Sequence, residues 1–108
     1  MPDVLKELTE VVASRRAAPQ EGSYTCYLFE KGLDKILKKV AEESGEVIIA
    51  AKNGDREQIC LEVCDLIYHL TVMMNECGVA LDDVYAELSA RSAKIGNLKQ
   101  MKNTDRNT

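Results

Sequence analysis

The chain has 108 residues and a formal net charge of −4 at pH 7, so we expect one small domain and no broad basic surface for nucleic acid. Aromatic residues are scarce, with no tryptophan and one phenylalanine, which favours a helical protein over a β-sandwich. Because no apolar run approaches the roughly 20 residues of a membrane span and the first residues lack a signal-peptide pattern, we expect a cytoplasmic protein without a membrane partner.

The first predicted element is an amphipathic helix from Val4 to about Arg16, where apolar residues recur at helical spacing. Pro19 and Gly22 interrupt regular structure after this helix. The apolar and aromatic segment 23–31 is then expected to be an extended piece that turns into the second helix.

The next two predicted helices form a hairpin. The second helix is expected to begin near Gly32 or at Asp34, which is a candidate N-cap, and to continue to about Lys52. The stretch Lys52–Asp55 supplies a glycine stop and an acidic start for the third helix. This third helix is expected to end at about Cys77.

The last predicted helix opens at Asp82 and runs to about Lys94. Residues 1–96 are assigned to one domain, and residues 97–108 to a polar tail that is expected to fray. The sequence contains no strand signal and no internal repeat. The expected fold is therefore all-α, an antiparallel bundle of four main helices.

The predicted helix over residues 55–77 has apolar or small side chains almost all the way round. A helix of this kind is normally surrounded by other helices, and four helices from one short chain hardly suffice for that. We therefore expect a homodimer or a higher oligomer to complete the bundle. The cysteines lack the spacing of a metal site, so we expect buried free thiols at Cys26, Cys60, Cys64 and Cys77.

Acidic residues gather beside the apolar stripes of the two hairpin helices. Counted from Gly54, Glu46 and Glu62 each lie eight residues from the turn, and Glu43 and Asp65 each lie eleven. In an antiparallel pair, equal distances from the turn mean equal heights, so these four carboxylates form two facing rungs about one helical turn apart. Crowded negative charge raises pKa values or recruits cations, and Mg²⁺ accepts carboxylate ligands. We therefore predict a divalent metal site.

A solvated acidic face is the alternative to a metal site. Lysines that could neutralise the glutamates lie about one turn before them, at Lys35, Lys38 and Lys39. This alternative is strongest for Glu42. It is weakest for Glu62 and Asp65, because apolar residues flank both of them.

His69 and Gly45 also invite a functional interpretation. A di-iron site is disfavoured because His69, the single histidine, follows Asp65 by four residues rather than three. We expect His69 to make a structural or supporting hydrogen bond. Gly45 inside a helix indicates close approach of another helix or of a phosphate, although simple tolerance of the glycine stays open.

The pattern Glu42-Glu43-x-x-Glu46, followed after fifteen residues by Glu62-x-x-Asp65, resembles the acidic signature of the all-α MazG-like nucleotide pyrophosphohydrolases. The stretches SYTCYLFEKGLDKILKKVAEESGEVIIAAKNGD and EVCDLIYHLTVMM resemble, more narrowly, the phosphoribosyl-ATP pyrophosphohydrolase family of histidine biosynthesis. The similarity covers about residues 23–88. It implies a dimer of helical chains that cleaves phosphoribosyl-ATP to phosphoribosyl-AMP and pyrophosphate with Mg²⁺, for which Mn²⁺ is expected to substitute.

The resemblance also implies roles for individual residues. The metal ligands would be the four carboxylates that the helix geometry brings together, Glu43, Glu46, Glu62 and Asp65. Water is expected to attack the α-phosphorus, with Glu42 as the candidate general base and Glu43 as an alternative that combines ligand and base roles. Candidate phosphate contacts are Lys38, Lys39, Lys52 and Arg91, with Lys31 a weaker one. Three residues of the family pattern are expected to shape the ligand site, namely Ser23, Tyr24 and Thr25, although packing explains Tyr24 equally well.

Two other functions stay open at this point. A MazG-like hydrolase of ordinary or damaged nucleoside triphosphates would share the acidic signature but should lack the SYT and LFEKG segments. A non-catalytic helical interaction module would lose no activity when Glu62 or Asp65 is neutralised.

Overall fold

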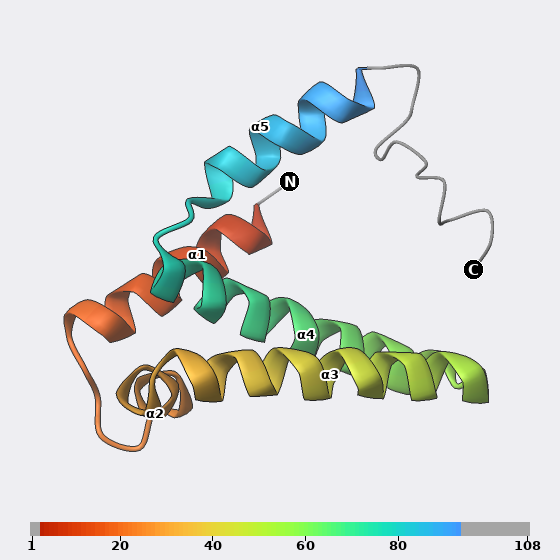
Figure 1. Cartoon of the computed structure of the whole chain (residues 1–108), viewed down its shortest axis with the longest axis horizontal. Helices are drawn as coiled ribbons and strands as arrows, with labels where there is room; N and C mark the ends of the chain where they lie inside the picture. Colours follow the sequence, from red (N-terminus) through yellow and green to blue (C-terminus); the bar gives the residue numbers. More distant parts are fainter. Residues whose placement is uncertain (1–2, 94–108) are drawn as a thin grey trace.

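A computed structural model describes residues 3–93, which form five α-helices and no strand (Figure 1). The helices are α1 (Val4–Ala17), α2 (Tyr24–Lys31), α3 (Leu33–Asn53), α4 (Arg56–Cys77) and α5 (Leu81–Ser92). The all-α prediction is confirmed. The last helix begins one residue before the expected Asp82, while its expected end at Lys94 and the expected tail 97–108 lie outside the described residues.

The segment 23–31 differs from the prediction, because it is a helix of its own and not an extended piece. Ser23 caps α2, and its side-chain oxygen accepts a hydrogen bond of 3.2 Å from the backbone N–H of Cys26. Gly32, with a φ of 92°, separates α2 from α3. Asp34 therefore lies in the first turn of α3 and is not its N-cap, and the described chain has five helices instead of four.

The hairpin of α3 and α4 has the predicted bounds. Gly54 ends α3 in the left-handed conformation, with a φ of 69°, and the side chain of Asp55 accepts a hydrogen bond of 3.1 Å from the backbone N–H of Gln58. Gly78 ends α4 in the same left-handed conformation. These caps fix where each helix stops and therefore which residues of the two helices face one another.

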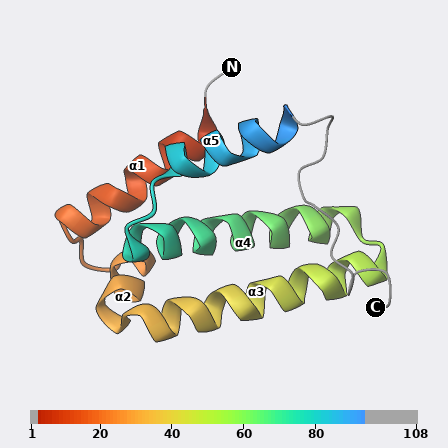
Figure 2. The same cartoon turned by 45° about the horizontal axis from the view of Figure 1, so that its top comes forward.

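The buried core lies at one end of this hairpin. Helices α1 and α2 gather at the end that is far from the Gly54 turn, where they pack against α4 and α3 (Figures 1 and 2). The apolar side chains buried there come from all four helices: Val12, Leu28, Ile36 and Val72. Helix α5 is joined to α1 by a hydrogen bond of 3.0 Å from the Tyr85 hydroxyl to Asp3 Oδ1.

The other end of the hairpin leaves apolar side chains uncovered in the single chain. Ile48 on α3 is 64% exposed and Leu61 on α4 is 53% exposed. The prediction that all four cysteines are buried is wrong for the single chain. Cys60 and Cys64 lie on the part of α4 that α1 and α2 leave uncovered, and Cys77 is the exposed last residue of α4. The cysteines are free, with Cys26 half-buried and the other three exposed. Within residues 3–93, no helix combines the length and the apolar character that crossing a membrane requires.

Candidate metal centre

The structure brings the four predicted carboxylates together between α3 and α4. One carboxylate oxygen each from Glu43, Glu62 and Asp65 lies within 4.8 Å of the other two. Glu46 adjoins this group, since Glu62 and then Glu43 raise the pKa of its carboxyl group. The equal count from the Gly54 turn thus predicted the contacts correctly, because the hairpin is antiparallel and its turn is short.

The two least exposed members of this carboxylate cluster each keep one oxygen without a partner. Glu43 is only 6% exposed, Glu62 is half-buried, and Glu46 and Asp65 are exposed. Within the described chain, Glu43 Oε2 and Glu62 Oε2 are buried and have no hydrogen-bond partner. Because an ionised carboxylate that is buried without a donor or a cation is costly, these two oxygens are suited to binding a cation.

Two side chains of the chain itself partly satisfy the cluster. Lys39 Nζ lies 3.4 Å from Glu43 Oε1 and 3.2 Å from Glu42 Oε2. The Gln58 amide donates a hydrogen bond of 2.7 Å to Glu62 Oε1. One ammonium group is thus shared by two carboxylates, and the cluster keeps a surplus of negative charge.

Mutual repulsion is visible in the protonation of Glu46. The neighbouring carboxylates of Glu62 and then Glu43 raise the pKa of Glu46 from 4.5 to about 7. They accept a hydrogen bond from protonated Glu46, and their negative charges oppose its ionisation. Glu46 is exposed, so the neighbouring negative charges cause this shift and burial contributes little. Strongly shifted pKa values of this kind gather at functional sites.

Glu42 lies beside the cluster but points to lysines. Its carboxylate is exposed and lies 3.2 Å from Lys39 and 3.9 Å from Lys38. The hydrogen bond from Lys39 is the main reason why the pKa of Glu42 falls below its usual range. These are the contacts that the solvated-face alternative expects for Glu42, in contrast to those of the four cluster carboxylates.

The predicted phosphate-binding cations separate into two groups. Lys38 and Lys39 border the acidic cluster through the contacts with Glu42. Lys52 is exposed and follows Glu43 by nine residues, which places it about 180° away around α3. Arg91 lies in the last turn of α5, with its Nε 2.9 Å from Glu87 Oε1. The structure therefore does not bring Lys52 and Arg91 to the cluster of the same chain.

His69 makes the supporting hydrogen bonds that the sequence predicted. It is 5% exposed, its Nδ1 lies 2.7 Å from the backbone oxygen of Asp65, and its Nε2 lies 3.0 Å from the Tyr24 hydroxyl. At Gly45, apart from its chain neighbours and the nearby backbone of its own helix, no atom of the described chain lies within 4 Å of the position that a Cβ would occupy. No helix of the same chain therefore requires a glycine there.

Sequence reasoning missed a small groove beside the cluster. It has a volume of about 140 Å³, and its polar lining includes Asn53 and Gln58 next to Glu46 and Glu62. The count from Gly54 could have found Asn53 and Gln58, since both lie on the turn side of the rung formed by Glu46 and Glu62. The groove offers room for a bound group next to the carboxylates.

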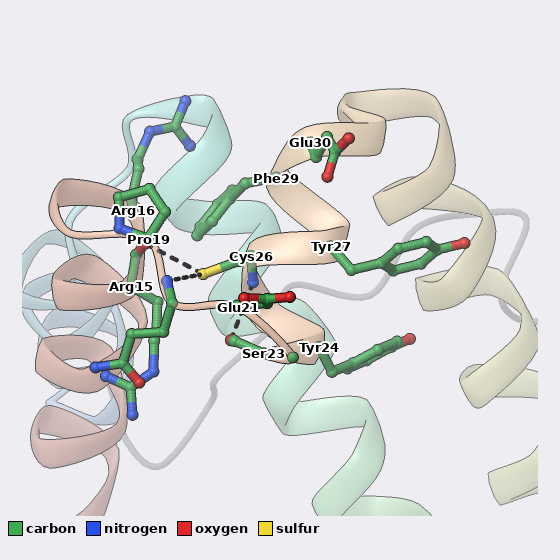
Figure 3. A pocket seen from close by; sticks show the side chains of 12 residues that line it. Arg15, Arg16, Pro19, Glu21, Ser23, Tyr24, Cys26, Tyr27, Phe29 and Glu30 are labelled. Atoms are coloured by element: carbon green, nitrogen blue, oxygen red, sulfur yellow. Dashed lines mark hydrogen bonds between the residues drawn. The ribbon is translucent and has the colours of Figure 1, made fainter.

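A wider hollow of about 860 Å³ lies elsewhere, between the end of α1 and α2 (Figure 3). Arg15 and Arg16 line it, but none of the four cluster carboxylates does. Arg16 is already engaged, since it lies 3.0 Å from Glu76 and its guanidinium stands over the ring of Phe29. The chemistry therefore points to the smaller groove as the site.

The donor set fits a hard divalent cation. The cluster offers only carboxylate oxygens, which Mg²⁺ and Mn²⁺ prefer, and two of these oxygens are buried without a donor. The all-α fold and this carboxylate centre define a helical protein with an acidic site suited to a hard metal ion, which is consistent with the MazG-like class.

Comparison with known proteins identifies the family of this chain. The sequence profile of the family described as Phosphoribosyl-ATP pyrophosphohydrolase matches residues 5–92, so the chain belongs to this family. A Phosphoribosyl-ATP pyrophosphatase from Clostridium botulinum is 54% identical over 102 residues, which cover 94% of this chain and 93% of the relative. One from Lactiplantibacillus plantarum is 50% identical over 95 residues, covering 88% of this chain and 90% of the relative. A Histidine biosynthesis bifunctional protein HisIE from Thermoanaerobacter pseudethanolicus is 60% identical over 84 residues, covering 78% of this chain and 39% of that longer protein. The resemblance found in the sequence is confirmed.

The shifted pKa of Glu46 predicts a pH dependence of stability in metal-free protein. Between about pH 4.5 and about pH 7 the folded chain holds a proton on Glu46 that the unfolded chain has released, so this contribution to stability is lost as the pH rises through 7. Glu46→Gln removes the titration. The free energy of unfolding is measured with urea in the presence of a chelator. As the pH rises from about 5 to about 8, the variant should gain stability relative to the wild type. Parallel pH profiles of the two proteins would contradict the predicted repulsion.

Proposed function

We propose that the cluster of Glu43, Glu46, Glu62 and Asp65 is the catalytic centre at which this chain hydrolyses phosphoribosyl-ATP to phosphoribosyl-AMP and pyrophosphate, a step of histidine biosynthesis. The observation that carries the proposal is the pair of buried, unpartnered oxygens on Glu43 and Glu62 inside a four-carboxylate cluster. The family membership and the names of the relatives support the substrate. A cytoplasmic location is expected for an enzyme of this kind.

The same four carboxylates would hold Mg²⁺, with Mn²⁺ as a substitute. A bound divalent cation neutralises phosphate oxygens, stabilises charge on the departing pyrophosphate and makes a bound water more acidic. The carboxylates of Glu43 and Glu62 suit this role because their buried oxygens lack another partner. A chain with a net charge of −4 thereby becomes able to accept a polyanion.

The residues around the cluster would position the substrate and the water. Glu42 is exposed and is the neighbour of Glu43 in the chain, so it is the candidate general base for the water that attacks the α-phosphorus. Glu43 is the alternative base. Lys38 and Lys39 border the cluster and would contact phosphate oxygens after releasing Glu42. Lys52 and Arg91 lie away from the cluster and would reach a substrate only at the centre of a partner chain.

The uncovered end of the α3–α4 hairpin supports a homodimer. Ile48 and Leu61 expose large apolar side chains there, and Cys60 and Cys64 are exposed on the same helix as Leu61. A second copy of the chain would cover these faces and complete the bundle around α4.

Substitution of the ligands tests the catalytic proposal. Glu62→Gln and Asp65→Asn should each lower pyrophosphate release from phosphoribosyl-ATP about 100-fold or more, because each removes a carboxylate from the cation site. Both variants should remain folded, since loss of one charge relieves repulsion. Glu42→Gln should lower kcat while the rise in Tm on addition of Mg²⁺ persists. Glu10→Gln, at an exposed position on α1, serves as the control and should leave both measurements unchanged.

Two outcomes would contradict this proposal. Efficient hydrolysis of deoxynucleoside triphosphates with phosphoribosyl-ATP untouched would favour a MazG-like enzyme that acts on other nucleotides. A wild-type chain that releases no pyrophosphate, with Glu62→Gln and Asp65→Asn indistinguishable from it, would favour a non-catalytic interaction module.

The oligomer is tested by a charge placed on the uncovered face. Light scattering on a sizing column should give the wild type at least twice the mass of one chain. Ile48→Glu and Leu61→Glu should shift it to the mass of a single chain, because a buried unpaired carboxylate opposes association. Val4→Glu, at an exposed position on α1, is the matched control and should leave the mass unchanged. A monomeric wild type would contradict the proposed dimer.

A further inference from the structure

Two side-chain pairs on successive residues join the start of α2 to α4. The Tyr24 hydroxyl lies 3.0 Å from His69 Nε2, and the Thr25 hydroxyl is hydrogen-bonded to the Tyr68 hydroxyl. The Tyr24 ring points away from the hollow between α1 and α2, on the same side as the ring of Tyr27 (Figure 3). The two pairs link the same two helices, but only the first continues to the carboxylate cluster.

The hydrogens of the Tyr24–His69 pair have one consistent arrangement. His69 Nδ1 lies 2.7 Å from the backbone oxygen of Asp65, which only accepts, so Nδ1 carries the hydrogen. In the neutral imidazole Nε2 is then the acceptor, and the Tyr24 hydroxyl donates to it. Tyr24 therefore fixes the ring of His69, and His69 fixes the backbone carbonyl of Asp65.

Tyr24 belongs to the short helix α2, which packs against both α3 and α4. Its ring stacks with Tyr68 at a centroid distance of 6.1 Å and meets His69 edge-on at 5.7 Å. A side chain from the helix that packs on α3 is thus hydrogen-bonded to the residue of α4 that lies one turn beyond Asp65.

We propose that Tyr24 and His69 are positioning residues for the cation site, which hold the backbone of α4 at Asp65 at its distance from Glu43. The inference rests on the proposed function, because it takes Asp65 as a metal ligand. Groups that orient the ligands of a metal ion typically affect its binding about 10-fold to 100-fold. The proposal also assigns a role to the segment Ser23-Tyr24-Thr25, since Ser23 caps α2 and thereby positions Tyr24.

The test measures Mn²⁺ binding to the full-length chain by calorimetry, with Mn²⁺ alone as the probe. Tyr24→Phe keeps the ring and removes only the hydroxyl, and we expect it to weaken Mn²⁺ binding about 10-fold. His69→Leu should weaken it at least as much, and the double variant should be no weaker than His69→Leu, because the two residues act in series. His69→Asn retains a donor for the Asp65 carbonyl and should recover part of the affinity.

The matched controls are Thr25→Val and Tyr68→Phe, which remove the neighbouring pair between the same two helices. These variants should lower the Tm as much as Tyr24→Phe does but change the Kd for Mn²⁺ less than about twofold, since the hydrogen bond that they remove joins Thr25 to Tyr68 and not to a residue of the cluster. Equal losses of Mn²⁺ affinity from the two pairs would overturn the positioning role and leave a structural one. If His69→Leu fails to fold, Tyr24→Phe against its controls still decides the question.

The same titration separates failure of this inference from failure of the proposed function. Mn²⁺ binding that Glu62→Gln abolishes but Tyr24→Phe leaves intact would overturn only the positioning role. If Glu62→Gln binds Mn²⁺ as tightly as the wild type, the proposed cation site is overturned, and the positioning role is overturned with it.

Discussion

Electrostatic repulsion among four carboxylates is the constraint on which the rest of this structure depends. The helix caps at Gly54 and Asp55 fix the register of α3 against α4, and this register sets Glu43 and Glu46 opposite Asp65 and Glu62. The repulsion raises the pKa of Glu46 and leaves oxygens of Glu43 and Glu62 without partners. Apolar burial at the other end of the hairpin, centred on side chains such as Ile36 and Val72, must offset this cost.

The exposure of the four carboxylates differs from one side of the cluster to the other. Glu43 lies at the buried end, Glu62 is half-buried, and Glu46 and Asp65 face solvent. A polyanionic substrate would therefore approach from the side of Glu46, where the small groove at Asn53 opens. Lys39 lies at the other end of the cluster, in contact with the buried Glu43.

Much of this arrangement follows from the sequence, because it depends on counting along regular helices. The bounds of α3 and α4 were predictable from Gly54, Asp55 and Gly78, and the facing carboxylates followed from equal distances to the turn. The identity of α2 as a separate helix was not predictable, since its aromatic and β-branched residues suit an extended segment equally well. Only the cap by Ser23 and the left-handed Gly32 decide it.

Burial was harder to predict than position. The apolar pattern of α4 indicated a surrounded helix, yet Cys60 and Cys64 are exposed in the single chain, because α1 and α2 cover only one end of the hairpin. The apolar pattern of a helix indicates which of its side chains are expected to be buried. It does not indicate which other helix packs against them. The contact between Tyr24 and His69 was equally hidden, since the two residues lie 45 positions apart in the sequence.

The most direct measurement of the central claim is a crystal structure with Mn²⁺, in which anomalous scattering locates the ion. The account predicts an anomalous peak between α3 and α4, within about 2.0–2.6 Å of oxygens from Glu43, Glu62 and Asp65. The unpartnered oxygens of Glu43 and Glu62 would then be ligands. Peaks only at other positions, with the four carboxylates turned toward lysines or solvent, would contradict it.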